Sequence, residues 1–269
     1  MSKSVLITGA SGGIGKALCD YFSDRGYRVL AHARREDQAY KLTAETPLVP
    51  VWGDLTQPDQ VAALAEQVKA AGPLDLLVHN AGILTTSTEP GPAGLGIQAE
   101  VNVVAPARLT EALADHMAQS DDPQVVLVTS SAANFARSSD YSKLATPDGS
   151  SLFGHYALSK CAANTLALQL AETFPQLKVF ATEPGFVKTK MTATNSSMPT
   201  PMRWAANLIA ATPKQAAHRC FDFLLDEKPA SGSVIQSGKV VKSDGKKWST
   251  QQAFDSLKGL LSRAGINWS

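Results

Sequence analysis

The sequence lacks a strong excess of charge of either sign and any long apolar run. Its 269 residues carry 25 Lys and Arg against 24 Asp and Glu, so the formal net charge is +1. A field that would attract nucleic acid or an anionic membrane is therefore not expected. No window approaches the roughly 18 uninterrupted apolar residues of a membrane span. The sequence predicts a protein with no nucleic-acid or membrane partner, whose ligand is a small molecule.

Cysteines and metal-ligand patterns are also sparse. Cys19, Cys161 and Cys220 are scattered without C-x-x-C spacing, which is typical of reduced thiols in a cytoplasmic compartment. The five histidines do not fall at ligand spacing with a cysteine or a carboxylate. We therefore expect a cytoplasmic protein that binds no metal.

What the sequence does contain is an alternation of short β-branched runs with longer helical patterns. This alternation predicts an α/β fold with a doubly wound parallel sheet of the Rossmann type, in a single domain over 1–269. The expected strands are 4–8, 28–33, 48–52, 74–79, 124–129 and 177–182, with a weaker one at 231–236. The expected helices are 14–25, 58–71, 95–117, 156–174 and a last one near 251–263. Three stretches rich in Gly, Pro, Ser and Thr are predicted to be loops that surround a substrate pocket: 84–96, 134–154 and 190–203.

A glycine-rich segment, TGASGGIG, follows the first strand and opens a helix. Gly9, Gly13 and Gly15 allow a tight turn, and a pyrophosphate fits among the unpaired N–H groups at the positive helix N-terminus. The spacing is G-x-x-x-G-x-G rather than the usual G-x-G-x-x-G, and a simple βα connection is the alternative interpretation.

The end of the second strand bears on the choice of nucleotide. Many dinucleotide sites carry an acidic residue there to hold the ribose 2′-hydroxyl, whereas this strand is followed by Arg34 and Arg35. A guanidinium can bind a 2′-phosphate through charge-assisted hydrogen bonds, so NADP(H) is favoured over NAD(H). The alternative is that both arginines are only solvated residues at a strand end.

The stretch HYALSK places Tyr156 and Lys160 on one face of a helix. A nearby cation lowers the pKa of a tyrosine and makes it a usable general acid or base. Alone, such a pair is more often a packed tyrosine and a surface lysine. Ser130 and Ser131 follow the strand 124–129 and could bond a carbonyl oxygen, and Asn102 lies in an apolar helical stretch where it needs a partner.

Together these residues resemble the short-chain dehydrogenase/reductase family in its single-domain form. The resemblance is carried, in the family's order over roughly the first 190 residues, by TGASGGIG (8–15), GDL (53–55), HNAG (79–82), Asn102, the serine after VVLVT, YALSK (156–160) and PGFVKT (184–189). It implies that Tyr156 transfers a proton to or from the substrate oxygen and that Lys160 lowers the tyrosine pKa and holds the nicotinamide ribose. Ser130, with Ser131 as the fallback, would orient the carbonyl.

The same resemblance gives Asn102 the role of tying the lysine to a water chain, while the nicotinamide supplies the hydride. The cofactor-binding residues that it implies, with Arg34 added from the argument above, are Gly9, Ser11, Gly12, Gly13, Ile14, Gly15, Arg34, Asp54, Leu55, Asn80, Ala81, Gly82, Tyr156, Lys160, Pro184, Gly185, Val187 and Thr189.

The sequence departs from the family pattern in three places. Ser130 and Tyr156 lie 26 residues apart where the family has about a dozen, and Tyr141 in DYSK is a rival with no apolar helix after it. We expect Tyr156 to be the active one and the insertion to shape the substrate pocket. His79 replaces a commoner asparagine, with little consequence expected. The C-terminal part resembles the retinol dehydrogenase-like branch without its membrane anchor, which leaves a monomer or homodimer open and a tetramer not assured.

The predicted function is an NADP(H)-dependent oxidoreductase that interconverts a carbonyl and an alcohol. An apolar or aromatic substrate is suggested by side chains in and beside 190–203, although these could equally serve packing: Met191, Met198, Met202 and Trp204. Two alternatives are an epimerase or dehydratase that recycles its nucleotide and a catalytically silent cofactor-binding sensor. Intact Ser130, Tyr156 and Lys160 argue against the sensor.

Overall fold

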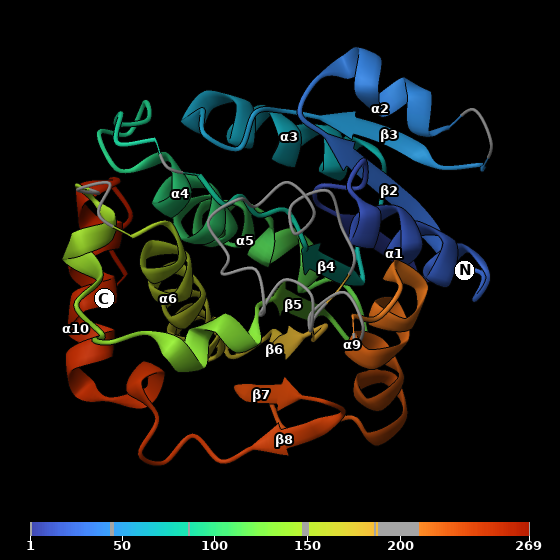
Figure 1. The fold of residues 1–269 in the computed structure, drawn as a ribbon. Helices are drawn as coiled ribbons and strands as arrows, with labels where there is room; N and C mark the ends of the chain where they lie inside the picture. The colour runs from blue at the N-terminus through green and yellow to red at the C-terminus, as the bar shows by residue number, and fades with distance from the viewer. Residues whose placement is uncertain are drawn as a thin grey trace.

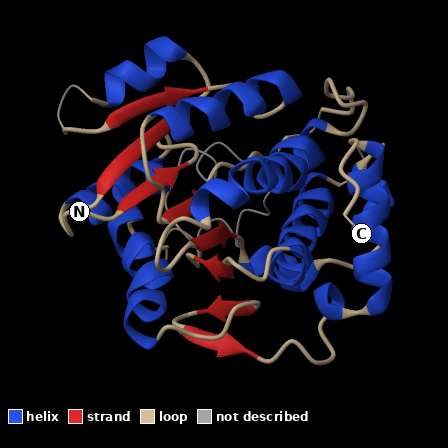
Figure 2. Cartoon of the chain, turned by 180° about the vertical axis from the view of Figure 1, so that it is seen from behind, coloured by secondary structure: helices blue, strands red, loops and turns tan. Residues whose placement is uncertain are grey.

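One sheet contains every strand in the part of the chain that the structure describes. The structure is a computed structural model, which describes residues 2–43, 46–85, 87–146, 151–185, 187 and 210–268. The strands are β1 (Ser4–Ile7), β2 (Arg28–Ala33), β3 (Val49–Trp52), β4 (Leu76–His79), β5 (Gln124–Val128), β6 (Lys178–Glu183), β7 (Ser233–Gln236) and β8 (Lys239–Val241). They run in the order β3-β2-β1-β4-β5-β6-β7-β8, and each neighbouring pair is parallel except β7 and β8, which pair antiparallel. Figure 2 shows the strands in red, with helices on both sides of them. The doubly wound α/β prediction is confirmed.

Helices cover both faces of this sheet. The α-helices are α1 (Gly13–Ser23), α2 (Glu36–Leu42), α3 (Pro58–Ala70), α4 (Ile97–Ala99), α5 (Ala105–Met117), α6 (Leu152–Thr173), α9 (Pro213–Glu227) and α10 (Gln251–Arg263). In Figure 1, α1 and α9 lie on one side of the sheet and α5 and α6 on the other, with α10 outside α6. Among the described residues, no helix combines the length and the apolarity that crossing a bilayer requires.

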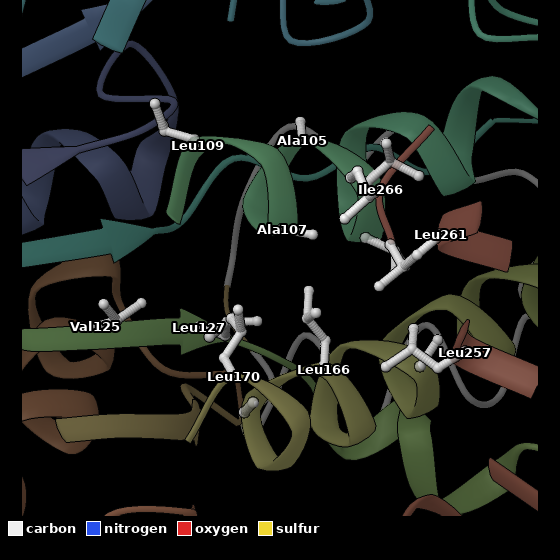
Figure 3. Packing of buried hydrophobic residues seen from close by; sticks show 14 of the residues in the cluster. Ala105, Ala107, Leu109, Val125, Leu127, Leu166, Leu170, Leu257, Leu261 and Ile266 are labelled. Atoms are coloured by element: carbon white, nitrogen blue, oxygen red, sulfur yellow. The ribbon is translucent and has the colours of Figure 1, made fainter. Parts of the chain in front are cut away.

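The larger of two hydrophobic clusters fills the space between the sheet, α5, α6 and α10. Leu127 of β5 and Leu166 of α6 are almost completely buried, and Leu257 and Leu261 of α10 join the same cluster (Figure 3). Burying a leucine side chain stabilises a fold by about 1.5–3 kcal/mol. The last helix is therefore part of the core rather than an appendage.

Three elements were not predicted from the sequence: α2, α9 and β8. The helix α2 spans only seven residues, too few for a helical period to stand out. The strand β8 pairs antiparallel with β7 through a tight hairpin in which Ser237 has φ +52° and Gly238 has φ +71°. Positive φ at both central residues is the backbone of a type I′ turn, which matches the twist of the two strands.

The expected helix 95–117 contains a wide turn. Its first part is α4 followed by a π-helix at Glu100–Val104, and α5 begins only at Ala105. Pro106 has no N–H to donate to the carbonyl of Asn102, so a regular α-helical ladder cannot be completed there. The prediction of one continuous helix was wrong at this point.

The predicted loop 134–154 is partly helical. Two short 3₁₀-helices, Ser131–Phe135 and Tyr141–Leu144, occupy part of it, and α6 begins at Leu152 instead of Tyr156. The earlier start follows from an N-cap, because the Ser151 hydroxyl accepts a hydrogen bond from the N–H of Gly154 at 3.0 Å.

The C-terminal segment is bonded to this insertion and to α6. The Lys247 ammonium donates to the carbonyl oxygen of Ala136, and the N–H of Tyr141 donates to the Ser256 hydroxyl at 2.7 Å. The Thr165 hydroxyl donates to the carbonyl oxygen of Trp248 at 2.8 Å. The C-terminal segment, the insertion and α6 are thus bonded to one another although they lie far apart in sequence.

His79, at the end of β4, is enclosed by the core. Its Nε2 lies 2.8 Å from the Thr110 hydroxyl, and burial lowers the pKa of His79 to about 3. The folded protein therefore holds this imidazole neutral at pH values where an exposed histidine, with a pKa of about 6.5, would be protonated.

We expect His79→Asn to make the fold less sensitive to acid. Below about pH 6.5 the unfolded chain gains a proton on His79 that the folded chain does not accept until about pH 3, so stability is lost as the pH falls through this window. Between pH 7 and pH 5 the loss from this group is about 2 kcal/mol. Urea unfolding at both pH values measures it. The same pH-dependent loss in the wild type and in His79→Asn would contradict the assignment.

Candidate active site

A cleft of about 1050 Å³ opens at the carboxyl ends of the parallel strands. It reaches from the segment after β1, past the ends of β2 and β3, to the segments after β4, β5 and β6. The predicted site residues that line it are Gly9, Ser11, Gly12, Gly13, Ile14, Gly15, Arg34, Asp54, Leu55, Asn80, Ala81, Gly82, Ser130, Ser131, Tyr156, Lys160, Pro184, Gly185 and Val187. Asn102 is not among the lining residues, and Thr189 and the segment 190–203 lie outside the described residues.

The glycine loop packs too tightly for side chains at two positions. Gly9 has φ +67°, and a Cβ there would lie 2.9 Å from the Cα of Ala81. A Cβ on Gly15 would collide with the carbonyl oxygen of Gly9. Among the described residues, no side chain caps the first turn of α1, and that turn contains no acidic residue. The loop thus offers N–H donors to an anion, which fits the pyrophosphate of a dinucleotide.

His32 of β2 is hydrogen-bonded to this loop, and this role was not predicted from the sequence. It is 2% exposed, its Nδ1 accepts a hydrogen bond from the N–H of Gly9 at 3.1 Å, and its Nε2 lies 2.9 Å from the carbonyl oxygen of Gly53. Because Nδ1 is the acceptor, Nε2 carries the proton and donates. Burial lowers the pKa of His32 to about 4, so the ring keeps this neutral form at pH 7. The signal in the sequence was a histidine inside an apolar strand.

The residues after β4 bond to the same loop. The Thr8 hydroxyl accepts from the N–H groups of Asn80 and Ala81, both at 3.0 Å. The Asn80 side chain donates to the carbonyl oxygens of Thr8 at 2.8 Å and Gly9 at 3.3 Å. Asn80 therefore shapes the floor of the cleft through its side chain.

Asn102 sits in the π-helical turn with its amide fully bonded. Its Oδ1 accepts from the N–H of Ile83 at 2.8 Å, and its Nδ2 donates to the carbonyl oxygen of Ile83 at 3.0 Å and to the Ser159 hydroxyl at 3.1 Å. The expectation of a partner for this buried amide is confirmed. A Cβ on Gly82 would lie 3.4 Å from Asn102 Oδ1 and 3.3 Å from Lys160 Nζ, which places both groups beside that glycine.

Lys160 is a buried cation whose ammonium lies at the carboxyl end of β5. It is 6% exposed, and its Nζ donates to the carbonyl oxygen of Val128 at 3.1 Å. Burial lowers the pKa of Lys160 to about 8. The same Nζ lies 5.8 Å from the ring centroid of Tyr156, so the two side chains do share one region of the cleft.

Ser130 and Tyr156 meet from different elements. Ser130 lies two residues after β5 and caps the 3₁₀-helix Ser131–Phe135, its hydroxyl accepting from the N–H of Ala132 at 3.2 Å. Burial raises the pKa of Tyr156, and a hydrogen bond with the Ser130 side chain lowers it in part. The Lys160 ammonium lies beside the ring and bonds to the carbonyl oxygen of Val128, and the expectation that it depresses this pKa stays a prediction. The hydroxyl of Tyr156 thus stays protonated at pH 7.

Tyr141 is separated from the cleft. It is fully buried, and its hydroxyl bonds to the hydroxyl of Thr165 at 2.6 Å and lies 3.4 Å from the sulfur of Cys161. It does not line the cleft, whereas Tyr156 does.

The two arginines after β2 differ in their partners. Arg35 is bonded to the Asp37 carboxylate at 2.9 Å through Nε and 3.3 Å through Nη2. Arg34 lies 4.0 Å from Asp54 and remains largely exposed at the edge of the cleft. Further cleft residues that were missed from the sequence include Lys16, Gln38, Ile83, Val101, Pro213 and Lys214. Leu84, Phe135 and Phe153 also line the cleft, and they come from the segments 84–96 and 134–154 that were predicted to surround a substrate pocket. Within the described ranges, no group of three or more His, Cys, Asp or Glu could hold a metal.

The parallel sheet with a glycine-lined cleft at its carboxyl edge defines a dinucleotide-binding α/β protein. A family model described as short chain dehydrogenase matches residues 3–200. The chain therefore belongs to the short-chain dehydrogenase family of NAD(P)-dependent oxidoreductases.

Named relatives agree with this assignment. The chain is 31% identical over 210 residues to a short chain dehydrogenase of Pseudocercospora fijiensis, a match that spans 74% of this chain and 64% of that protein. It is 26% identical over 246 residues to the (+)-neomenthol dehydrogenase of Arabidopsis thaliana, covering 69% of this chain and 83% of that protein. Neither match bears on the retinol dehydrogenase-like branch, which stays a prediction.

Solved structures share the fold. A short chain dehydrogenase of Shigella flexneri 2a, solved with NADP, is 25% identical with a TM-score of 0.63, covering 88% of this chain and 97% of that one. The 3-alpha-hydroxysteroid dehydrogenase of Pseudomonas sp. B-0831, solved with NADH, is 21% identical with a TM-score of 0.68, covering 87% and 94%. Both nucleotides thus occur among structures of this fold.

We expect His32→Leu to weaken dinucleotide binding. The change leaves the N–H of Gly9 and the carbonyl oxygen of Gly53 without their partner, at a cost of about 1–3 kcal/mol, so the Kd for NADPH should rise about tenfold. Isothermal titration calorimetry measures it.

The matched control is His116→Leu, which removes a comparable bond to the carbonyl oxygen of Gly72 at 3.0 Å away from the cleft. Equal effects of the two variants on the Kd would contradict a specific role for His32.

Proposed function

We propose that the protein is an NADP(H)-dependent oxidoreductase that interconverts a ketone or aldehyde and an alcohol. The observation that carries the proposal is the meeting of Ser130 and Tyr156 in the cleft whose other end is formed by the glycine loop. A carbonyl oxygen within reach of both hydroxyls could accept hydrogen bonds from each. Nicotinamide chemistry supplies the hydride when the cofactor is bound.

Residues of the chain itself provide the proton and position the substrate oxygen. Tyr156, protonated at pH 7, is the proposed donor to the oxygen that gains negative charge, and Ser130 the proposed second donor to the same oxygen. The buried ammonium of Lys160 provides positive charge next to this pair and a donor for the nicotinamide ribose. Asn102 holds the segment that leads to Lys160 through Ser159.

NADP(H) is the proposed nucleotide because Arg34 is available to a 2′-phosphate. Its guanidinium has one distant carboxylate neighbour, at 4.0 Å, whereas two nitrogens of Arg35 are bonded by Asp37. A guanidinium with open donors can form charge-assisted hydrogen bonds to phosphate. The first turn of α1, which has no side-chain cap, is proposed to hold the pyrophosphate through its backbone N–H groups.

We also propose a cytoplasmic location, since the three cysteines are buried and free, as in a reducing compartment. For its assembly we propose a monomer or a homodimer. The remaining predicted cofactor contacts, including Pro184, Gly185, Val187 and Thr189, are proposed to bind the same nucleotide.

We expect Tyr156→Phe to lower the rate of carbonyl reduction by about a hundredfold or more, because the proton donor is lost. NADPH absorbance, followed with a panel of aldehydes and ketones, measures the rate and should fall one-for-one with alcohol formed. Turnover without net loss of NADPH would overturn the reductase proposal in favour of an epimerase or dehydratase.

The control for that experiment is Tyr141→Phe, which removes a hydroxyl bonded in the core. It should keep activity within a few-fold and lower the free energy of unfolding by about 1 kcal/mol. If Tyr156→Phe behaved in the same way, Tyr156 would not be the proton donor.

We expect Arg34→Ala to raise the KM for NADPH about tenfold and to leave the KM for NADH nearly unchanged, because only NADPH carries the 2′-phosphate. Steady-state kinetics with both nucleotides measure the difference. Arg35→Ala is the matched control, since its guanidinium already pairs with Asp37. A wild-type preference for NADH, or equal losses in the two variants, would remove the role of Arg34.

A further inference from the structure

Two exposed phenylalanines stand at the substrate end of the cleft. Phe135 is the last residue of the 3₁₀-helix that follows Ser130, and Phe153 lies in the first turn of α6, three residues before Tyr156. Both line the cleft, and their ring centroids are 5.9 Å apart with an angle of 59° between the planes. The two elements that carry the proposed reacting groups therefore also carry this pair.

We propose that Phe135 and Phe153 form an aromatic clamp that selects carbonyl substrates bearing an aromatic ring. The inference rests on the proposed carbonyl reduction and names the substrate class of that site. The ring of the substrate packs against the two phenylalanines while its carbonyl oxygen reaches the hydroxyls of Ser130 and Tyr156.

The exposure of the pair has no explanation in the fold. Phe135 is 57% exposed and Phe153 38%, whereas Phe22, Phe180 and Phe221 are almost completely buried. Among the described residues the large exposed hydrophobic side chains are four in number, and two of them meet here: Tyr40, Phe135, Phe153 and Val240. Covering apolar area is worth about 25 cal/mol per Å², so a ligand that covers both rings is favoured.

Both rings are carried on backbone that is already fixed. Next to Phe135, the carbonyl oxygen of Ala136 accepts from the Lys247 ammonium. Next to Phe153, the N–H of Gly154 donates to the Ser151 hydroxyl at 3.0 Å. A preformed clamp loses little conformational entropy when it binds a rigid ring.

The surroundings of the pair are apolar. The other cleft residues with hydrophobic side chains at this end are Ile83, Leu84, Val101, Ala132 and Val187. Of the charged lining residues, Lys16, Asp20, Arg34, Arg35 and Asp54 come from α1 and from the segments after β2 and β3, at the other end. Two more are Lys214 of α9 and Lys160, whose ammonium is buried beside Tyr156 and bonded to the carbonyl oxygen of Val128. A charged or polyhydroxylated substrate would lose its hydration against the hydrophobic side chains around Phe135 and Phe153 and would gain no new hydrogen bonds from them.

An aromatic ring gains more here than a saturated ring of the same size. Aromatic pairs favour tilted or offset geometry with centroids about 4.5–7 Å apart, which the 5.9 Å spacing of the pair already has. A third ring can extend this arrangement. The clamp therefore discriminates acetophenone from cyclohexyl methyl ketone, which has a ring of the same size on the same methyl ketone. Only the carbonyl of acetophenone is conjugated with its ring, and this intrinsic difference is the same in the wild type and in every variant, so the change in preference between them reports the clamp.

The experiment compares these two ketones with NADPH in the wild type, Phe135→Ala, Phe153→Ala and Phe135→Leu. We expect the wild type to prefer acetophenone in kcat/KM, and each variant to lower that preference about three- to tenfold. Phe135→Leu keeps an apolar side chain without the ring, so it separates stacking from volume. Tyr40→Ala, an exposed aromatic residue that does not line the cleft, is the control and should leave the preference unchanged.

Binding of both ketones to the protein with NADP⁺ is measured in parallel by saturation-transfer NMR. Selective binding of acetophenone that the variants lose, without turnover by the wild type, would support the clamp and refute the proposed reduction. Equal losses for both ketones, or a wild type that neither binds nor prefers acetophenone, would overturn the clamp. Thermal unfolding confirms that each variant is folded.

Discussion

The side-chain amide of Asn102 holds together the segments on which the cleft depends. It bonds to both backbone groups of Ile83, just after the HNAG stretch, and to the hydroxyl of Ser159 on α6. Ser159 precedes Lys160, so an amide that does not itself line the cleft helps to position the buried ammonium. Pro106 permits the π-helical turn that points this amide inward, because it removes the N–H that an α-helical turn would need.

The two ends of the cleft are lined by chemically different groups. At the nucleotide end, a neutral buried imidazole ties the glycine loop to Gly53, and backbone donors face the space where charge would lie. At the other end the lining is largely apolar and aromatic, and its polar groups include Ser130, Tyr156 and the ammonium of Lys160. An anionic group and an uncharged ring are therefore each offered a matching surface in one continuous space.

Much of this arrangement could be predicted from the sequence because it depends on local patterns. Buried strands such as SVLI read as continuous apolar runs, and the glycines before α1 mark a turn that larger residues cannot make. The start of α6 was missed because serine, which caps the helix five residues before Tyr156, is common in loops as well. The role of His32 and the burial of Tyr141 depend on partners 21 to 115 residues away, which no local pattern reveals.

The bonds between the C-terminal segment and the insertion also have a consequence for the order in which the protein is made. The contact between Lys247 and Ala136 joins residues 111 positions apart, and that between Ser256 and Tyr141 joins residues 115 apart. At about 5–20 residues per second, a ribosome needs roughly 5–20 s to supply the second partner of each pair. The nucleotide end, built from β1 to β5, has all its strands long before that. The contacts of the C-terminal segment form last, so until the chain is nearly complete the insertion that carries Phe135 lacks its bonds to Lys247 and Ser256.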